Sequence, residues 1–99
     1  AKENINFSEL SEIELRVGSI EILDPEKKFD FIFANISSSI ITKYSDKIFS
    51  LLSKQGILLC SGILNVHMKN TLKKLEESGL TLINSYQEQD WSSLEMKID

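Results

Sequence analysis

One continuous apolar run constrains this chain more than any other feature. Residues 29–36 read Phe-Asp-Phe-Ile-Phe-Ala-Asn-Ile, and after Asp30 only Asn35 is polar. An apolar run bounded by polar residues predicts a strand buried on both faces, which is typical of a parallel sheet covered by helices. Open α/β sheets bind ligands at the carboxyl ends of their strands. Asn35 is therefore either a ligand contact or the cap of a following helix, and capping is the commoner role.

The composition limits the classes of function. Ninety-nine residues suit at most one small domain, and a net charge of −4 with no basic stripe argues against a large nucleic-acid footprint. The apolar runs are too short to span a bilayer, and the polar first residues do not resemble a signal peptide. A lone Cys60 indicates a reducing compartment, and we expect it to be a small buried hydrophobe. His67 is the only histidine, which leaves no histidine cluster for a metal site.

The apolar run belongs to a predicted strand–helix–strand unit. Residues 13–17 alternate between apolar and polar and predict a half-buried edge strand, which is followed by a turn at Asp24-Pro25. Residues 38–52 place their apolar side chains on one helical face, and Gly56 is expected to end that helix in a left-handed conformation. The apolar residues 57–61 then predict a second central strand. The strand 31–35, this helix and the second strand form a βαβ unit.

The last third of the chain predicts a second helix and a hairpin. Residues 66–78 carry an apolar stripe of Met68, Leu72 and Leu75, and Gly79 marks the end of that helix. Residues 80–86 and 91–98 then read as strands joined by a polar connection. These two strands should therefore be antiparallel.

Three segments resemble class I S-adenosylmethionine-dependent methyltransferases, and most closely the bacterial ribosomal protein methyltransferases of the PrmA type. Residues 29–36 are similar to that family's fourth-strand motif, in which aspartate and apolar residues precede Ala-Asn-Ile. Residues 52–64 resemble its helix stop and fifth strand, which ends in Ser-Gly-Ile-Leu. Residues 90–94 resemble the acidic-Trp step that opens the final strand. The pairing of Ala-Asn-Ile with Ser-Gly-Ile-Leu is fairly specific, whereas each motif alone is weak.

The resemblance implies an α/β fold, namely a Rossmann-like methyltransferase half-domain with a mostly parallel sheet, helices packed on it and a carboxyl-terminal antiparallel hairpin. Residues 1–99 would be the carboxyl-terminal part of the methyltransferase domain. The family's glycine-rich cofactor loop and substrate-recognition domain have no counterpart in them. The start at Ala1 without a methionine hints at truncation, and Ala1–Asn4 resembles the end of a helix already under way.

The resemblance also implies an order of strands. The family's order is three-two-one-four-five-seven-six, which predicts 31–35, 57–61, 91–98 and 80–86 as neighbours in that sequence. The strand 13–17 corresponds to the third strand and would lack the neighbours that separate it from 31–35 in the family. It would then be detached from the sheet, or it would pair directly beside 31–35. Otherwise a second chain would cover that apolar edge, because a bare edge is an aggregation template.

On the cofactor side, the resemblance assigns roles to four residues. Gly18, Ser19 and Ile20 fall in the loop that packs on the adenine of S-adenosylmethionine, although Ser19 is equally open to a plain turn role. Asn35 matches the family's motif asparagine, whose side chain faces the methyl donor and the incoming amine. Its amide oxygen would accept a hydrogen bond from the amine and orient it for in-line attack.

On the substrate side, the resemblance points to three residues. Ser61 and Gly62 fall at the carboxyl end of the neighbouring strand, where a glycine lets the backbone approach a substrate closely. Trp91 would line the channel that takes a lysine side chain, although an aromatic residue on a hairpin is more often part of the core.

The implied activity is transfer of a methyl group from S-adenosylmethionine to amino groups of a large-subunit ribosomal protein in the cytoplasm. We expect the parent protein to be the enzyme and to accelerate the reaction by positioning and desolvating the reactants. We expect the isolated chain to be inactive and unable to bind the cofactor. A ribosomal protein is the expected partner, and we expect no contact with a membrane and no direct contact with nucleic acid. Self-association through an exposed edge of the Phe31 strand is an open option. Two alternatives remain: a class I methyltransferase for a small molecule or nucleic acid, or a non-catalytic interaction module.

Overall fold

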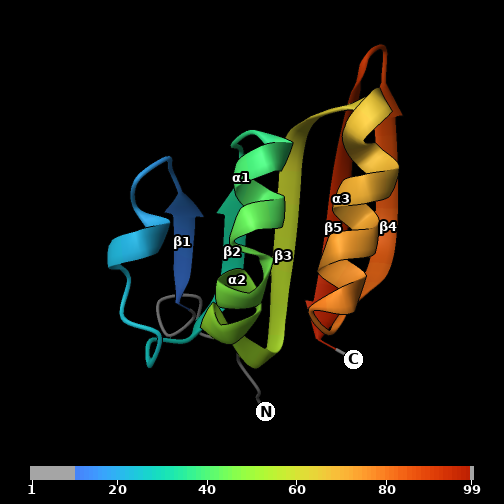
Figure 1. Ribbon diagram of the computed structural model, residues 1–99. Helices are drawn as coiled ribbons and strands as arrows, with labels where there is room; N and C mark the ends of the chain where they lie inside the picture. The colour runs from blue at the N-terminus through green and yellow to red at the C-terminus, as the bar shows by residue number, and fades with distance from the viewer. Residues whose placement is uncertain (1–10, 99) are drawn as a thin grey trace.

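A computed structural model describes residues 11–98, which form a five-stranded mixed sheet with helices on one face (Figure 1). The order across the sheet is β1-β2-β3-β5-β4. The first three strands in this order are parallel, and β5 is antiparallel to both of its neighbours. The strands are β1 (Glu12–Leu15), β2 (Phe29–Ala34), β3 (Leu52–Leu64), β4 (Leu80–Glu88) and β5 (Trp91–Ile98).

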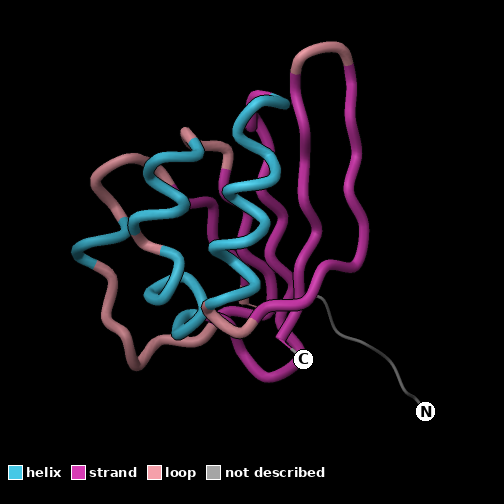
Figure 2. Tube along the Cα trace, turned by 45° about the vertical axis from the view of Figure 1, so that its right-hand side comes forward, coloured by secondary structure: helices cyan, strands magenta, loops and turns pink. Residues whose placement is uncertain are grey.

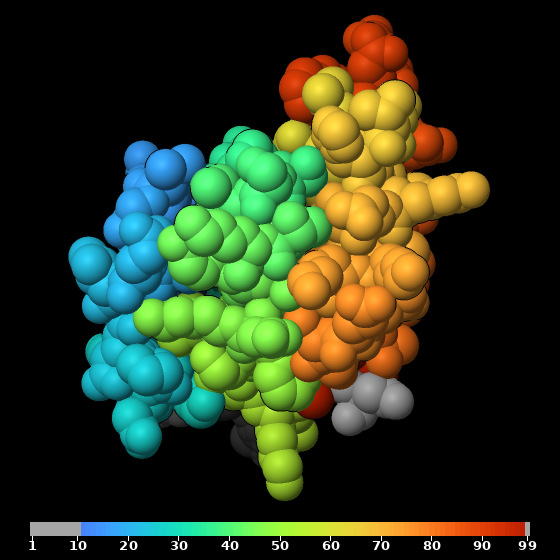
Figure 3. Space-filling view, in the orientation of Figure 1, coloured from blue at the N-terminus to red at the C-terminus, as the bar shows by residue number. Residues whose placement is uncertain are grey.

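The helices all lie against the same face of the sheet (Figure 2). They are the short 3-10 helix η2 (Ile20–Ile22) and the α-helices α1 (Ser38–Lys43), α2 (Ser45–Leu51) and α3 (Asn65–Glu77). In the space-filling view of this face, α1 in green and α3 in yellow and orange lie side by side (Figure 3). Phe31 and Phe33 point to the opposite face of the sheet and are exposed. Among residues 11–98, no helix has both the length and the apolar character needed to cross a membrane.

The hydrophobic core fills the layer between the sheet and these helices. Side chains alternate along β2, so that Ile32 and Ala34 face the helices and are fully buried. The fully buried members are Leu15 of β1, Ile20 of η2, Ile32 and Ala34 of β2, Leu58, Cys60 and Ile63 of β3, Leu94 and Met96 of β5, and Ile41, Ile48, Leu51 and Leu75 of the helices. Each large aliphatic side chain buried in this way contributes ~1.5–3 kcal/mol relative to leaving it exposed.

The predicted order of the four later strands is confirmed. The strand 13–17 lies at the edge of the sheet, as expected, and it pairs beside β2 over the register Glu12↔Phe31 to Leu15↔Ala34. Because β1 covers β2, the Phe31 strand has no exposed edge. Of the two options for that edge, pairing within the chain is the one observed, so the backbone groups that a second chain would have paired with are already bonded to β1.

The helix predicted over 38–52 is wrong in two respects. It divides into α1 and α2 at Tyr44, whose φ of −109° and ψ of 21° leave the helical range. It also ends at Leu51, so Gly56 lies inside β3 and does not have a positive φ. Gly56 is instead required by close packing, because a Cβ there would lie 2.9 Å from the carbonyl oxygen of Phe29 and 2.8 Å from Cδ2 of Leu52.

The remaining elements follow the predictions closely. The helix predicted over 66–78 is α3, and Gly79 ends it with a φ of +113°. The turn at Asp24 is closed by the Lys27 amide, which donates to the Asp24 carbonyl oxygen at 3.0 Å. The last two strands form an antiparallel hairpin, with β4 extending to Glu88 and a tight turn at Gln89–Asp90. The predicted helix end at Ala1–Asn4 lies outside the described residues.

Candidate functional site

Asn35 is held in place at the carboxyl end of β2 by its two neighbours. Ala34 is fully buried and Ile36 is only 8% exposed, whereas Asn35 itself is exposed. The residue that caps α1 is Ser37, and no side chain makes a capping hydrogen bond there. The capping interpretation of Asn35 is therefore wrong, and its amide is available at the end of the strand.

Next to Asn35, β3 carries an extra residue that changes the direction of its backbone. Its pairing with β5 runs from Cys60↔Leu94 to Ile63↔Ser92, which places one more residue on β3 than on its partner. Ser61 and Gly62 occupy this bulge, and Gly62 has a φ of +75°. Bulges of this kind often lie beside functional sites, where they redirect the backbone.

The bulge brings the backbone of Gly62 against the side chain of Asn35. A Cβ built on Gly62 would lie 2.6 Å from Oδ1 of Asn35, closer than real Cβ contacts allow. The amide oxygen therefore occupies the space that a glycine leaves empty. Of the predicted site residues, Asn35 and Gly62 are thus in direct proximity, and half-buried Ser61 is adjacent on the bulge.

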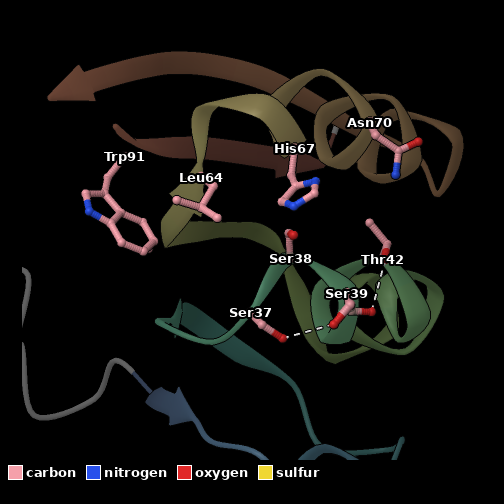
Figure 4. A pocket seen from close by; sticks show the side chains of 9 residues that line it. Ser37, Ser38, Ser39, Thr42, Leu64, His67, Asn70 and Trp91 are labelled. Atoms are coloured by element: carbon pink, nitrogen blue, oxygen red, sulfur yellow. Dashed lines mark hydrogen bonds between the residues drawn. The ribbon is translucent and has the colours of Figure 1, made fainter. Parts of the chain in front are cut away.

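A cleft of about 510 Å³ opens beside Gly62, between α1 and α3 at the carboxyl ends of β2 and β3 (Figure 4). Hydroxyl groups of α1 and of the residue before it form one wall, and the start of α3 with the end of β3 and the start of β5 forms the other. The lining residues are Ser37, Ser38, Ser39 and Thr42 on the first wall, and Leu64, His67, Asn70 and Trp91 on the second.

Trp91 lies at the mouth of this cleft and not in the core. Its side chain is 51% exposed, and its backbone pairs with Leu64 at the end of β3. In Figure 4 the indole ring lies beside Leu64, across the opening from Ser37. The interpretation of Trp91 as a core residue is therefore wrong.

The loop after β1 lies at the same end of the sheet but does not line the cleft (Figure 1). Gly18 has a φ of +89° and open space around it. The Ser19 hydroxyl donates to the carbonyl oxygen of Arg16 at 2.7 Å and accepts from the Arg16 amide at 2.9 Å, so this side chain closes its own turn. The Ile20 side chain is fully buried. Only the backbone of these residues is open to a ligand.

The cleft is nearly free of charge. His67 is the only ionisable side chain among its lining residues, and residues 11–98 contain no group of three or more histidine, cysteine or acidic side chains that could hold a metal ion. Cys60 is fully buried, which confirms it as a small buried hydrophobe, and this burial raises the pKa of its thiol to about 12. The arrangement can therefore orient a ligand through amide and hydroxyl groups and exclude water with apolar ones.

A carboxyl group with a depressed pKa, that of Asp30, lies away from the cleft at the start of β2. The Ser53 hydroxyl donates to Asp30 at 2.7 Å and the Ser11 amide donates at 3.1 Å, and these hydrogen bonds hold the pKa of Asp30 below its usual 3.8. Asp30 thus joins the start of β2 to β3 and to the residue before β1. Its role is structural.

Of the residues that the sequence proposed for the site, Gly62 and Trp91 line the cleft, whereas Asn35 lies against Gly62 without lining it, and most of the cleft walls were missed. His67 and Asn70 are three residues apart at the start of a helix, so they share one face. That spacing, directly after the Gly62 bulge, was the available signal.

The described fold is that of a Rossmann-like methyltransferase, with the cleft at the edge where such sheets bind ligands. It is similar to a crystal structure of a ribosomal protein L11 methylase from Lactobacillus delbrueckii subsp. bulgaricus, with a TM-score of 0.74 and 24% identity over 80% of this chain and 40% of that one. A TehB-like SAM-dependent methyltransferase from Corynebacterium glutamicum has a TM-score of 0.65 at 15% identity, over 83% of this chain and 54% of that one.

The chain belongs to the ribosomal protein L11 methyltransferase (PrmA) family, whose model matches residues 1–99. It is 31% identical over 99 residues to the ribosomal protein L11 methyltransferase of Clostridium perfringens, covering 99% of this chain and 31% of that protein. The corresponding protein of Fusobacterium nucleatum is 30% identical, over 98% of this chain and 32% of its own length. The chain therefore spans about a third of the length of these curated relatives.

Proposed function

We propose that the protein carrying this chain is a cytoplasmic enzyme that transfers methyl groups from S-adenosylmethionine to amino groups of ribosomal protein L11. Membership of the PrmA family and the names of its relatives support this substrate and this reaction. The observation on this chain that carries the proposal is the exposed Asn35 amide, held against Gly62 between two buried neighbours.

In this proposal Asn35 orients the acceptor amine. Its amide oxygen accepts a hydrogen bond from the amine nitrogen, which directs the nitrogen lone pair toward the methyl group. The cofactor, when bound, supplies a methyl group made electrophilic by a positively charged sulfur. Holding the amine and the methyl group in line makes the reaction effectively unimolecular. This positioning supplies a large part of the rate acceleration that an enzyme can reach.

The walls of the cleft favour the reactive form of the acceptor. A neutral amine attacks, whereas an ammonium ion has no lone pair to share. Trp91 and Leu64 provide an apolar passage for an alkyl stem, and partial desolvation there disfavours the charged form. The hydroxyl groups of the α1 wall accept or donate hydrogen bonds to the polypeptide that carries the amine.

The described residues fit only part of a site for S-adenosylmethionine. The open, left-handed turn at Gly18 suits close approach of an adenine ring to the backbone. The Ser19 side chain, however, is engaged with Arg16, and the Ile20 side chain is buried. We propose that the glycine-rich loop and the ribose-binding acid of the family lie elsewhere in the longer protein, and that residues 1–99 alone are inactive.

The test is methylation of purified L11 by the full-length protein, followed by mass spectrometry and single-turnover rates. Asn35→Ala should lower the rate roughly a hundredfold, since loss of one orienting polar contact commonly costs a few kcal/mol in the transition state. Its folding should be almost unchanged because the side chain is exposed. Asn84→Ala is the matched control, because Asn84 is an exposed asparagine on β4 outside the cleft. A wild-type protein that does not methylate L11 would overturn the proposed substrate, and normal turnover by Asn35→Ala would remove Asn35 from the mechanism.

A further inference from the structure

Asn65, the first residue of α3, makes three hydrogen bonds to the hairpin between β4 and β5. Its backbone amide donates to the carbonyl oxygen of Asp90 at 2.9 Å, and its side-chain amide nitrogen donates to the carbonyl oxygen of Gln89 at 2.8 Å. Its side-chain oxygen accepts a hydrogen bond from the hydroxyl of Ser92. One residue thus joins the cleft wall to the hairpin: its backbone amide bonds Asp90, and its side chain bonds Gln89 and Ser92.

The turn that Asn65 holds is one that an isolated hairpin would adopt reluctantly. Gln89 has a φ of +55°, in the left-handed region that residues other than glycine rarely adopt. The hairpin tip extends beyond the helix-covered part of the sheet (Figure 1), and residues 83–91 are all exposed. Ser92, by contrast, is only 2% exposed and points its hydroxyl at Asn65. The contacts of Asn65 therefore fix an otherwise protruding turn.

Trp91 lies between the two anchored positions. It follows Asp90, whose carbonyl oxygen binds the Asn65 amide, and it precedes Ser92, whose hydroxyl binds the Asn65 side chain. The indole ring forms part of the cleft wall beside Leu64, which is the residue before Asn65. Any freedom in the turn would therefore move this ring relative to the cleft.

We propose that Asn65 is a positioning residue that fixes the Gln89–Asp90 turn and so holds the Trp91 ring as a preformed wall for the alkyl stem of the acceptor amine. The inference rests on the proposed function and extends it to how the acceptor is recognised. The apolar face of an indole packs against methylene groups. A wall that is ordered before binding avoids the loss of side-chain entropy on association.

The chemistry of an asparagine side chain explains why this residue type is required. The amide presents a donor and an acceptor at one end, which match the Gln89 carbonyl oxygen and the Ser92 hydroxyl at the same time. Aspartate would accept from Ser92 but would face the Gln89 carbonyl oxygen without a proton to donate. Alanine would leave both groups without this partner.

The first measurement is the order of the turn in the 15N-labelled full-length protein. Amide order parameters of residues 88–91 should be near the rigid value of ~0.85 in the wild type and should fall below ~0.6 in Asn65→Ala. Asn84→Ala is the matched control, since it removes the side-chain hydrogen bond to Glu95 from the stem of the same hairpin and should leave these values unchanged. Asn65→Asp keeps the acceptor for Ser92, so its order parameters should lie between those of the wild type and those of Asn65→Ala. It takes the place of the alanine variant if that variant does not fold. Unchanged order in the Asn65 variants would overturn the positioning role.

The second measurement separates positioning from general damage. Asn65→Ala should raise the KM for L11 by roughly five- to tenfold with kcat changed by less than about twofold, whereas loss of folded protein would lower the apparent kcat instead. If Asn65 acts through Trp91, the double variant with Trp91→Ala should have the KM of Trp91→Ala alone. Multiplicative effects, or an unchanged KM in Asn65→Ala, would refute the acceptor wall. Absence of methylation by the wild type would reject the proposed function instead, and the order parameters would still decide the positioning role.

Discussion

Gly62→Ala should impair catalysis far more than folding, and the structure allows both effects to be estimated. An L-residue in the left-handed region costs ~1–2 kcal/mol, and the φ of Gly62 is +75°. The added Cβ would also lie 2.6 Å from Oδ1 of Asn35, so that side chain must rotate away. Because Asn35 is exposed, this rotation costs only about a further 1 kcal/mol. We therefore expect a loss of ~2–3 kcal/mol in unfolding free energy.

The catalytic effect should be larger, because the rotation displaces the amide that orients the amine. Methyl transfer by the full-length protein should fall roughly a hundredfold, equivalent to ~2.7 kcal/mol of transition-state stabilisation. Urea denaturation and single-turnover rates are the two assays. Gly18→Ala is the matched control for stability, since Gly18 has a φ of +89° but nothing within 4 Å of its would-be Cβ. It should lose only the backbone contribution of ~1–2 kcal/mol.

A double-mutant cycle tests whether the effect of Gly62→Ala passes through Asn35. In the Asn35→Ala background the added Cβ no longer meets an amide oxygen, so the second substitution should not lower the rate further. The reasoning is refuted if Gly62→Ala retains a rate within about twofold of the wild type. It is equally refuted if the two substitutions multiply their effects, because the glycine would then act independently of Asn35.

Three further predictions concern stability and binding. The pKa of Asp30 is held below 3.8 by Ser53 and Ser11, so its contribution to stability should be complete well above that pH and lost as the pH falls through the lower, folded-state pKa. The unfolding free energy of the wild type should therefore exceed that of Asp30→Asn at neutral pH, and acid titration should make the difference disappear as Asp30 is protonated. Gly56→Ala should reduce the unfolding free energy by ~1–3 kcal/mol in urea, because its Cβ would lie 2.9 Å from the Phe29 carbonyl oxygen, and an unchanged midpoint would contradict this close packing. The 99-residue chain should bind S-adenosylmethionine with a Kd weaker than ~1 mM, and a micromolar value in calorimetry would show that it builds its own cofactor site.

Most regular elements could be predicted because their sequence patterns agree with their burial. The apolar run at 31–34 became β2, the helical stripe ending before Gly79 became α3, and two alternating segments around a polar turn became the antiparallel hairpin. Local pattern could not predict the division of a helix at Tyr44 or the early start of β3 at Leu52. Apolar side chains at 48, 51 and 52 fit either a helix or a buried strand end, and tertiary packing decides between them.

The sequence indicated the edge of the sheet only through residues near the carboxyl ends of strands. Asn35 directly follows β2, and Gly62 lies in the bulge close to the end of β3. The hydroxyl wall of α1 and the role of Asn65 depend on contacts between residues far apart in sequence. The Asn65 side chain reaches Gln89, 24 residues away, and no periodic pattern encodes a hydrogen bond of that kind.

The irregular backbone of this chain is concentrated where its chemistry is proposed to occur. Four described residues have a positive φ, and Gly18, Gly62 and Gln89 all lie at the end of the sheet where β1, β2 and β3 finish (Figure 1). Gly79 is the exception, and it only ends a helix. Conformations of this kind are costly and persist where the surrounding structure enforces them, which is commonly at binding sites. Here the bulge at Gly62 makes room for the Asn35 amide, and the turn at Gln89 is held by Asn65. The regular elements supply a rigid frame, and the departures from regularity place the amide and the indole that the proposed reaction requires.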